Sequence, residues 1–488
     1  MTPPRVLLVG IDSADPELLA RALPQLPNLR RLVEGGSLRD LQSPAAVMSA
    51  AVWPTFYTGQ DPGWHGYYFP MQWDAEHMRL RRVSDRWLYC EPFWYALARE
   101  GLPVTAFDVQ TEFPSRIPRG VEITNWGSQS FTGMRSSDPA LGRALRRRFG
   151  RHPLGPDVPA PKTRRRLAAI RRDCLAGARA KGEASLWLLR ETDWRLFLTV
   201  FVELHRAGHN LWPDPEVGVP DDTALREVFR AVDREVGRLV GAVDLRETTV
   251  IVFSLHGMGS NDAQDHFLPE ILDRFNARFA GRALPAARAS RPQHSAMRWL
   301  RARVPGTAQE AIGRKMPDRV RDFVVSRQFG RGFDWARTPG FALPSGGEGY
   351  VRCNLAGRER EGCLPADGAC LGLYLKELVE TLRALRIGES DAPLVADVCF
   401  PSREFAGPAA SRLPDVAVRW SGEPPAREVV SPTLGRFRGR LATGRGGNHR
   451  PGGFAIVAGR RPEGIDLELR DAKDFARVVP RLLGGRAV

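Results

Sequence analysis

Lysine, cysteine and long apolar runs are scarce in this sequence. Lys and Arg together number 71 and give a formal net charge of +15, yet only five of these residues are lysine. The arginines gather in runs such as 143–151 and 164–172, which lack the regular aromatic interleaving of nucleic-acid-binding surfaces. We therefore expect solvated helix faces that steer small anionic substrates toward the protein, and no nucleic-acid polymer as a partner.

The six cysteines show no CxxC pairing, which argues against a zinc knuckle and a dense disulfide framework. No apolar run approaches the roughly eighteen residues of a membrane span. The first expected strand opens at Arg5, with no basic and apolar leader before it. The sequence therefore predicts a soluble, cytoplasmic protein with no membrane partner. It gives no indication of an oligomeric state.

Short apolar runs at 5–10, 104–109, 196–204 and 248–254 predict strands that are buried on both faces. Helical patterns separate these runs, so an α/β fold with a largely parallel central sheet is expected. With 43% apolar residues, the 488-residue chain can fill the core of one large domain with insertions, or of two domains.

A stretch of small and aromatic residues begins at Ser49. A strand-like run at 37–43 breaks at Pro44, and Ser49 then opens a segment that can wind as a helix until Thr58-Gly59. A hydroxyl at a helix N-terminus faces unpaired backbone N–H groups and the positive end of the helix dipole, which suits an anionic substrate. Ser49 is therefore a candidate nucleophile, although serine is also a common helix cap at such a position.

Two histidines follow the expected strand at 196–204. The period of a strand places Glu203 and His205 on one face, and Gly208 allows the backbone to turn so that His209 points toward the same place. A third histidine, His449, lies in a glycine-rich loop near the C-terminus, where glycines permit a close approach to a metal ion. Paired histidines at a strand end also fit ordinary polar packing.

Ser49 opens a spaced set of residues that continues with Trp53, Thr58-Gly59, Pro62 and His65-Gly66. This set resembles the nucleophile segment of the alkaline phosphatase superfamily, in the branch of type I phosphodiesterases and nucleotide pyrophosphatases. Residues 6–12 resemble the first strand and first metal-binding Asp of that family, and residues 27–29 resemble its Pro-Asn-Leu helix start.

The resemblance implies an α/β fold, an alkaline phosphatase-like three-layer sandwich with a largely parallel central sheet and inserted cap segments. The core is expected at residues 1–270 and 390–488, with an insertion loop at 110–162 that is rich in Pro, Gly, Ser and Arg. Residues 271–389 are expected to form an inserted cap or subdomain, which includes much of a basic, irregular stretch at 278–331.

The resemblance also assigns a nucleophile and metal ligands to positions of this sequence. Ser49 is the expected catalytic residue, and the expected metal ligands are Asp12, Ser49, His205, His209, His256 and His449. His205 stands where the family usually has Asp, and imidazole is a standard zinc ligand. Leu255 replaces an Asp that usually precedes the histidine, and leucine cannot bind a metal ion. Glu203 or Asn261 is a candidate for the missing ligand, and Arg358 contacts substrate or holds a turn by an ion pair.

The implied cofactor is a divalent metal, with zinc favoured and iron or manganese as alternatives, at one or two ions per chain. The implied activity is that of a metal-dependent phosphoester hydrolase or transferase, most similar to a phosphodiesterase or nucleotide pyrophosphatase. It acts on a small anionic phosphoester through a phosphoseryl intermediate on Ser49. The alternative, suggested by Leu255 and His205, is a degenerate member that binds a phosphorylated ligand without turnover.

A sulfatase-like hydrolase is the least favoured interpretation. Residues 399–403 fit the Cys-x-Pro-Ser-Arg pattern of sulfatases in the same superfamily. The sulfatase cysteine, however, occupies the early nucleophile position that Ser49 holds in this sequence. We therefore expect the match at 399–403 to be fortuitous.

Overall fold

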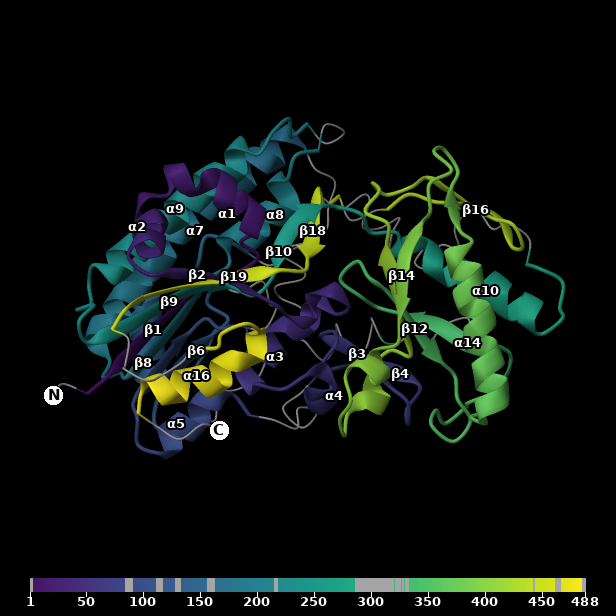
Figure 1. The fold of residues 1–488 in the computed structure, drawn as a ribbon, viewed down its shortest axis with the longest axis horizontal. Helices are drawn as coiled ribbons and strands as arrows, with labels where there is room; N and C mark the ends of the chain where they lie inside the picture. Colours follow the sequence, from purple (N-terminus) through teal and green to yellow (C-terminus); the bar gives the residue numbers. More distant parts are fainter. Residues whose placement is uncertain are drawn as a thin grey trace. The chain divides into compact units, whose positions relative to one another are not determined.

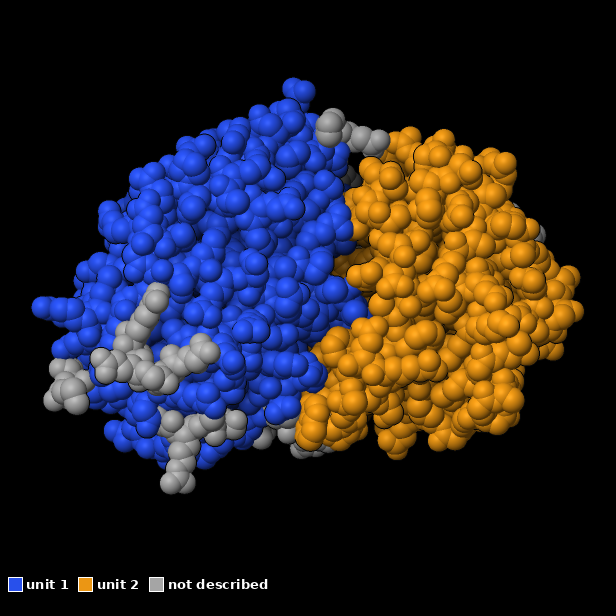
Figure 2. All heavy atoms as spheres, in the orientation of Figure 1, with its two compact units in different colours: residues 1–61, 84–260, 444–488 blue, residues 62–83, 261–443 orange. Residues whose placement is uncertain are grey.

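The computed structural model divides the chain into two compact units (Figure 2). The structure describes residues 3–83, 91–110, 117–127, 133–155, 163–214, 218–285, 320, 326, 329, 333–441, 444–460 and 467–484. The first unit comprises residues 1–61, 84–260 and 444–488, and the second comprises residues 62–83 and 261–443. Most of the basic stretch predicted at 278–331 lies outside the described residues.

An eight-stranded sheet forms the centre of the first unit (Figure 1). Its strands, in spatial order, are β2 (Ser37–Leu41), β19 (Gly453–Gly459), β9 (Thr248–Ser254), β1 (Arg5–Ile11), β8 (Leu196–Phe201), β5 (Val104–Phe107), β6 (Gly120–Thr124) and β7 (Arg135–Ser136). The strands from β9 to β6 run parallel, whereas β2, β19 and β7 pair antiparallel with their neighbours. The predicted largely parallel central sheet is confirmed.

Strand β1 lies between β8 and β9 because its side chains are apolar on both faces. Its residues from Val6 to Val9 are fully buried, and the register sets Leu8 beside Leu198 and Ile251. Such an uninterrupted apolar run is what a strand covered on both faces requires. The position at which β1 ends is therefore fixed by the core.

Helices cover both faces of this sheet and give the unit three layers (Figure 1). One face carries α1 (Pro16–Ala22), α2 (Pro27–Glu34), α7 (Arg164–Glu191), α8 (Glu203–Leu211) and α9 (Thr223–Val240). The other face carries α3 (Val52–Thr58), α5 (Phe93–Arg99) and α16 (Phe475–Leu482). Among the helices that the structure describes, none is long and apolar enough to cross a membrane. The predicted three-layer α/β architecture is confirmed.

The second unit has its own antiparallel sheet and its own core. The sheet consists of β11 (Gly340–Leu343), β12 (Gly349–Cys353), β15 (Val416–Trp420) and β14 (Val395–Cys399), in that order. Helices α10 (Leu268–Phe279) and α14 (Gly368–Arg383) contribute Phe275 and Tyr374 to a hydrophobic cluster distinct from that of the first unit. The unit also contains a hairpin of β3 (Met71–Asp74) and β4 (Arg79–Arg82) and a three-stranded sheet in the order β13 (Arg386–Ile387), β16 (Glu428–Ser431) and β17 (Gly435–Arg438).

The boundaries of these units differ from the predicted domains. Residues 395–420 were expected in the core at 390–488, but they form β14 and β15 of the second unit, because β15 pairs with β12. Residues 62–83 also belong to the second unit, where the Trp73 ring lies 4.8 Å from that of Phe341. The hydrophobic patterns predict these strands but do not indicate which sheet each one joins.

The predicted insertion loop at 110–162 is also corrected by the structure. Its described part contains β6 and β7 of the central sheet and the helix α6 (Pro139–Phe149). Strand β6 has only five residues and opens with Gly120. A composition rich in Pro, Gly, Ser and Arg therefore concealed a short strand whose partner, β5, supplies the register.

The Pro-Asn-Leu start of α2 is capped by a carboxylate from another helix. Leu26 precedes α2 and offers no side-chain cap. Asp233 on α9 is 1% exposed and accepts hydrogen bonds from the backbone N–H groups of Asn28 (3.3 Å) and Leu29 (2.8 Å). It also accepts one from the Asn28 side-chain amide at 2.9 Å. A carboxylate at a helix N-terminus satisfies open N–H donors and interacts favourably with the helix dipole.

We expect Asp233→Ala to lower the free energy of unfolding of the first unit by about 2 kcal/mol, because it leaves the Asn28 and Leu29 donors at the start of α2 without their acceptor. Thermal unfolding followed by circular dichroism would measure this loss. Asp222→Ala is the matched control, since Asp222 precedes α9 without a side-chain capping hydrogen bond. Equal effects of the two substitutions would contradict the capping role of Asp233.

Candidate active site

The candidate site lies at the edge of the central sheet where the parallel strands end. Asp12 follows β1 directly, α8 begins two residues after β8 ends, and His256 lies two residues beyond β9. The strand β18 (Gly447–Arg450) brings His449 to the same edge, because it immediately precedes the antiparallel strand β19. Functional side chains in open α/β sheets gather at this edge.

His205 and His209 are carried by a helix and not by the end of a strand, which corrects the predicted local structure. Strand β8 ends at Phe201, and α8 spans Glu203–Leu211. Residues four apart lie on one face of a helix, so α8 presents both imidazoles side by side. The recurrence of Leu204, Ala207 and Leu211 is a helical signal that the strand interpretation overlooked.

Two glycines allow β18 to approach α8 closely. A Cβ atom on Gly447 would lie 2.3 Å from the carbonyl oxygen of Gly208, and a Cβ atom on Gly208 would lie 2.7 Å from the Met258 side chain. Met258 belongs to β10 (Gly257–Ser260), which pairs antiparallel with β18 and places Met258 opposite His449. A side chain at either glycine would push His449 away from α8.

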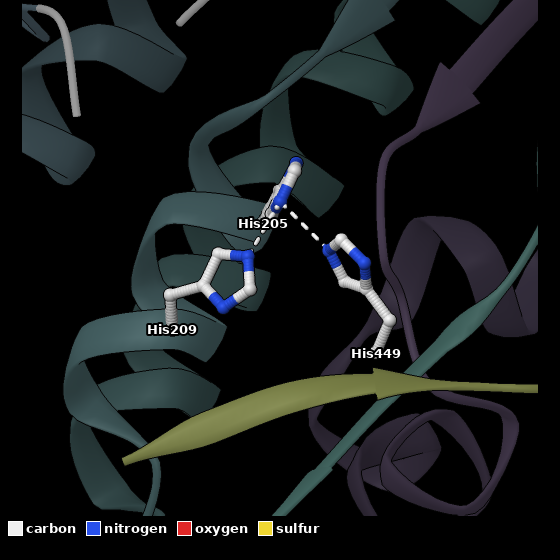
Figure 3. A group of neighbouring side chains, drawn as sticks. All are labelled: His205, His209 and His449. Carbon is white, nitrogen blue, oxygen red and sulfur yellow. Dashed lines mark hydrogen bonds between the residues drawn. The ribbon is translucent and has the colours of Figure 1, made fainter. Parts of the chain in front are cut away.

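Three imidazoles converge at this place, and their Nε2 atoms face one another (Figure 3). The Nε2 atom of His205 lies 2.9 Å from that of His209 and 3.0 Å from that of His449. Nitrogen ligands that bind one zinc ion tetrahedrally at about 2.05 Å are about 3.3 Å apart. The cluster is therefore close to the spacing of a three-histidine metal site.

The hydrogen-bond partners of the Nδ1 atoms indicate which ring nitrogen carries the proton in His205 and His209. The Nδ1 atom of His205 lies 2.5 Å from Oδ2 of Asp12, and Nδ1 of His209 lies 2.9 Å from the carbonyl oxygen of Gly447. An ionised carboxylate and a carbonyl oxygen only accept, so both Nδ1 atoms donate. A neutral imidazole has one N–H. The Nε2 atoms of His205 and His209 therefore face each other as two lone pairs.

Where both rings are neutral, two lone pairs 2.9 Å apart repel each other, and a metal ion between them turns this repulsion into attraction. A proton is disfavoured, because burial, followed by the charge of Arg445, lowers the pKa of His209 well below its ordinary value. Burial, followed by the charge of His256, likewise lowers the pKa of His449. Neutral imidazoles are the form that binds metal ions. The donor set therefore fits a divalent ion such as zinc.

Asp12 connects this cluster to three other parts of the first unit. Its Oδ2 atom accepts hydrogen bonds from Nδ1 of His205 and from the Gln110 side-chain amide, both at 2.5 Å. Its Oδ1 atom accepts one from the indole N–H of Trp53 at 3.0 Å and lies 3.5 Å from Nε2 of His256. Burial acts to raise the pKa of Asp12, but His205 and then His256 hold it well below its usual range. Asp12 is therefore a buried, ionised carboxylate.

Ser49 opens a 3₁₀ turn, η3 (Ser49–Ala51), that runs directly into α3. This agrees with the predicted helical segment, and Gly59 ends α3 in the left-handed conformation, with φ 69°. Trp53 lies one turn beyond Ser49 on the same segment. Since the Trp53 indole binds Asp12, the segment that carries the candidate nucleophile is hydrogen-bonded to the carboxylate beside the histidines.

The three additional candidates have partners of their own. Nε2 of His152 lies 2.9 Å from Oε1 of Glu203, and both side chains are fully buried. The Asn261 side chain accepts a hydrogen bond from the Ala263 N–H at 3.1 Å. Arg358 forms two hydrogen bonds with Asp415, at 2.6 and 2.7 Å, and also binds Glu359. Arg358 thus holds its turn by ion pairs, the second of the two roles considered for it.

A sequence profile of the type I phosphodiesterase / nucleotide pyrophosphatase family matches residues 6–325. The chain belongs to this family. The predicted membership is confirmed, and it supports a phosphoester hydrolase. No curated protein sequence matches the chain.

Solved structures of the same fold include a bacterial and a mammalian enzyme. Phosphonoacetate hydrolase from Sinorhizobium meliloti 1021, in complex with phosphonoformate, has a TM-score of 0.53 and 17% identity; the match covers 99% of this chain and 96% of that chain. Murine ectonucleotide pyrophosphatase / phosphodiesterase 5, in an inactive form in complex with AMP, has a TM-score of 0.53 and 12% identity, with the same coverage. At these identities the likeness shows the fold alone.

Two departures from the usual family pattern occur in this site. His205 replaces a usual Asp and lies within the three-histidine cluster. Leu255 replaces another Asp, is 1% exposed, and belongs to the main hydrophobic core of the first unit. Position 255 therefore supplies apolar packing where the family usually has a carboxylate.

The sulfatase-like pattern at 399–403 lies elsewhere in the fold. Cys399 ends β14 of the second unit, whereas Ser49 belongs to the first. Burial, followed by the charge of Glu404, raises the pKa of the Cys399 thiol to about 12. A thiol with so high a pKa is a poor nucleophile. This environment gives no support to a sulfatase-like role.

Sequence reasoning missed Gln110 and Arg445 and saw Trp53 only as part of a motif. Gln110 lies three residues beyond β5, at the same sheet edge as Asp12, and this position was the available signal. Arg445 lies four residues before His449 in the glycine-rich segment, close enough for its charge to act on two of the histidines. The Trp53 contact could not be found from spacing, because it joins residues 41 positions apart.

We expect His209→Ala and His449→Ala each to remove the metal ion, because a three-ligand site loses a third of its donors. The affinity should fall by more than the roughly 10–100-fold that loss of an outer partner costs. Elemental analysis of desalted protein would measure this. His266→Ala is the control, since His266 belongs to neither of the two groups of described residues that could hold a metal ion. Full metal content in both site variants would make these histidines structural.

We expect Leu255→Asp to lower the free energy of unfolding by about 3 kcal/mol or more, because it removes core packing and buries an unpaired carboxylate. Leu255→Met, which keeps the volume and polarity, should cost less than about 1.5 kcal/mol. Chemical denaturation of the metal-free protein would measure both. A Leu255→Asp variant as stable as the parent would show that the position opens onto the metal site.

Proposed function

We propose that this chain is a metal-dependent phosphoester hydrolase of the phosphodiesterase or nucleotide pyrophosphatase type. The observation that supports it most directly is the convergence of three Nε2 atoms beside an ionised carboxylate at the sheet edge. Family membership supports the class of reaction. The cytoplasmic location and the small anionic substrate remain predictions from the sequence.

Ser49 is the proposed nucleophile. Its hydroxyl oxygen attacks phosphorus in line, an O–P bond forms, and the bond to the leaving oxygen breaks. This step yields a phosphoseryl intermediate and an alcohol or a phosphate-containing leaving group. A water molecule then attacks the same phosphorus, which returns the serine hydroxyl and releases the phosphorylated product.

His205, His209 and His449 would hold the divalent ion, for which zinc is the proposed identity. When bound, such an ion supplies positive charge that polarises a phosphoryl oxygen and favours ionisation of a nearby hydroxyl. The chain itself orients the metal-binding rings and the segment that carries the nucleophile. Asp12 and the Gly447 carbonyl fix the rings of His205 and His209, and Trp53 ties the Ser49 segment to Asp12.

A phosphodiester or a pyrophosphate-linked nucleotide is the proposed substrate class. The imidazole cluster contributes no negative charge, and the charge of Arg445 acts on His209 and His449. Both features favour an anionic ligand. One structural neighbour was solved with AMP, a phosphate ester, and another with phosphonoformate, a phosphonate, and both ligands carry an anionic group with phosphorus bound to several oxygens.

The competing function is binding of a phosphorylated ligand without turnover. The apolar environment of Leu255 is the observation that favours it, since one usual carboxylate ligand is missing. Assay of the metal-loaded chain with bis(p-nitrophenyl) phosphate separates the two. Measurable turnover supports the hydrolase, whereas ligand binding without turnover supports the degenerate binder.

We expect Ser49→Ala to lower kcat for the same diester by at least about a thousandfold, because it removes the atom that attacks phosphorus. Ser49→Thr should retain measurable activity, since threonine offers the same hydroxyl. Ser43→Ala is the control, because Ser43 only caps the preceding turn, where its side chain accepts from the Ala45 N–H. Activity of Ser49→Ala within a few fold of the parent would remove Ser49 from the mechanism.

A further inference from the structure

The carboxylate of Asp12 is almost fully used by partners within the protein. An ionised carboxylate has about four lone-pair positions, two on each oxygen. On Oδ2, His205 and Gln110 occupy both. On Oδ1, Trp53 occupies one and the imidazole of His256 faces the other at 3.5 Å. Nδ1 of His256 lies 3.0 Å from the Gly257 carbonyl oxygen, so in the neutral ring Nε2 carries a lone pair and does not donate to Asp12. Both positions on Oδ2 are therefore used, and one position on Oδ1 is open toward His256.

In the contact between Asp12 and His205, a carboxylate outside the ligand set accepts a hydrogen bond from a metal-binding histidine. The ring of His205 offers Nε2 to the three-histidine centre, and its Nδ1–H donates to Asp12. A carboxylate in this position fixes the tautomer and orientation of a metal-binding histidine and raises its basicity. The arrangement exists because residue 205 is histidine. An Asp at that position would face Asp12 as a second negative charge and would repel it.

The place of a second ion has one carboxylate fewer than the family pattern and keeps the open position on Asp12, Nε2 of His256 and the Ser49 hydroxyl as donors. The family pattern would build it from Asp12, Ser49, His256 and a carboxylate at position 255. Leu255 removes that carboxylate and is packed in the hydrophobic core. Glu203, which the sequence offered as a replacement, lies with Oε1 2.9 Å from Nε2 of the buried His152. Substitution of two usual Asp residues by His205 and Leu255 removes two negative charges, which equals the charge of one divalent ion.

We propose that the chain holds a single divalent ion, bound by His205, His209 and His449, and that Asp12 is a positioning residue for His205 rather than a metal ligand. This inference deepens the proposed function and rests on its metal dependence. It differs from the ligand set expected from the family resemblance, in which Asp12, Ser49 and His256 hold a second ion.

The first test is the stoichiometry of the full-length chain. The protein is stripped with a chelator, loaded with excess Zn²⁺, desalted and analysed for metal and protein. One zinc ion per chain is expected. Two ions per chain would overturn the single-ion proposal and leave the proposed hydrolase intact, whereas no bound ion would overturn both.

The second test uses Asp12→Asn, which keeps the size of the side chain and removes its charge. We expect one ion per chain still to bind, with an affinity lower by about 10–100-fold in competition with a chromophoric chelator. The visible spectrum of the Co²⁺-loaded variant should keep the shape of the parent spectrum, because the ligand atoms are unchanged. Asp15→Asn is the matched control, since Asp15 caps α1 and asparagine caps equally well.

Two results would overturn the role of Asp12. If Asp12 binds the ion, Asp12→Asn should change the Co²⁺ spectrum or lose an ion from the parent stoichiometry. If Asp12 has only a structural role, the variant should bind metal as tightly as the parent. Thermal unfolding of the metal-free variant reports whether it folds. Should it fail to fold, Trp53→Phe removes one donor to Asp12 and serves as the second variant, for which a several-fold loss of zinc affinity is expected.

Discussion

The carboxylate of Asp12 joins four segments of the first unit, and the candidate site depends on this junction. Asp12 follows β1, and its partners come from the segment after β5, from α3 and from α8. Asp12 itself is buried, so its carboxylate would carry a large desolvation cost without these partners. Because the carboxylate and its donors are hydrogen-bonded to one another, the segments that carry them are held in place at the sheet edge. The segment that carries Ser49 is thereby held in a fixed position relative to the imidazole cluster, although His449 is 400 residues further along the sequence.

The positions of the three histidines depend on backbone geometry as well as on side-chain chemistry. The helical spacing of α8 places His205 and His209 together, and the pairing of β10 with β18 brings His449 opposite Met258. Gly208 and Gly447 permit the approach of these elements, since a Cβ atom at either position would collide with a neighbour. The Gly447 carbonyl then accepts the Nδ1–H of His209. The same glycine therefore allows the close approach and orients one of the rings.

The sequence predicted the sheet and the gathering of histidines, because both depend on local patterns. Continuous apolar runs indicate buried parallel strands, and the ends of such strands share one edge. The continuation of β8 through residue 204 was wrong, because a strand period and a helical period both fit a short segment. The assignment of residues 395–420 to the core was also wrong, since strand pairing depends on partners distant in sequence. The contacts of Asp12 with Gln110 and Trp53 could not be predicted either, because they also join residues that are distant in sequence.

The charges of the site can be related to the substrate under the single-ion proposal. Three neutral imidazoles add nothing to a divalent ion, and Asp12 offsets one of its two positive charges. Arg445 acts on the same histidines and adds one positive charge. By this count the site has about two excess positive charges, and a phosphodiester supplies one negative charge in its ground state. When Ser49 gives its proton to solvent as it attacks, its oxygen adds the second negative charge, so the positive charge of the protein is balanced more closely in the transition state than in the complex with substrate. Such an excess favours the reacting arrangement over simple binding, which is the condition for catalysis.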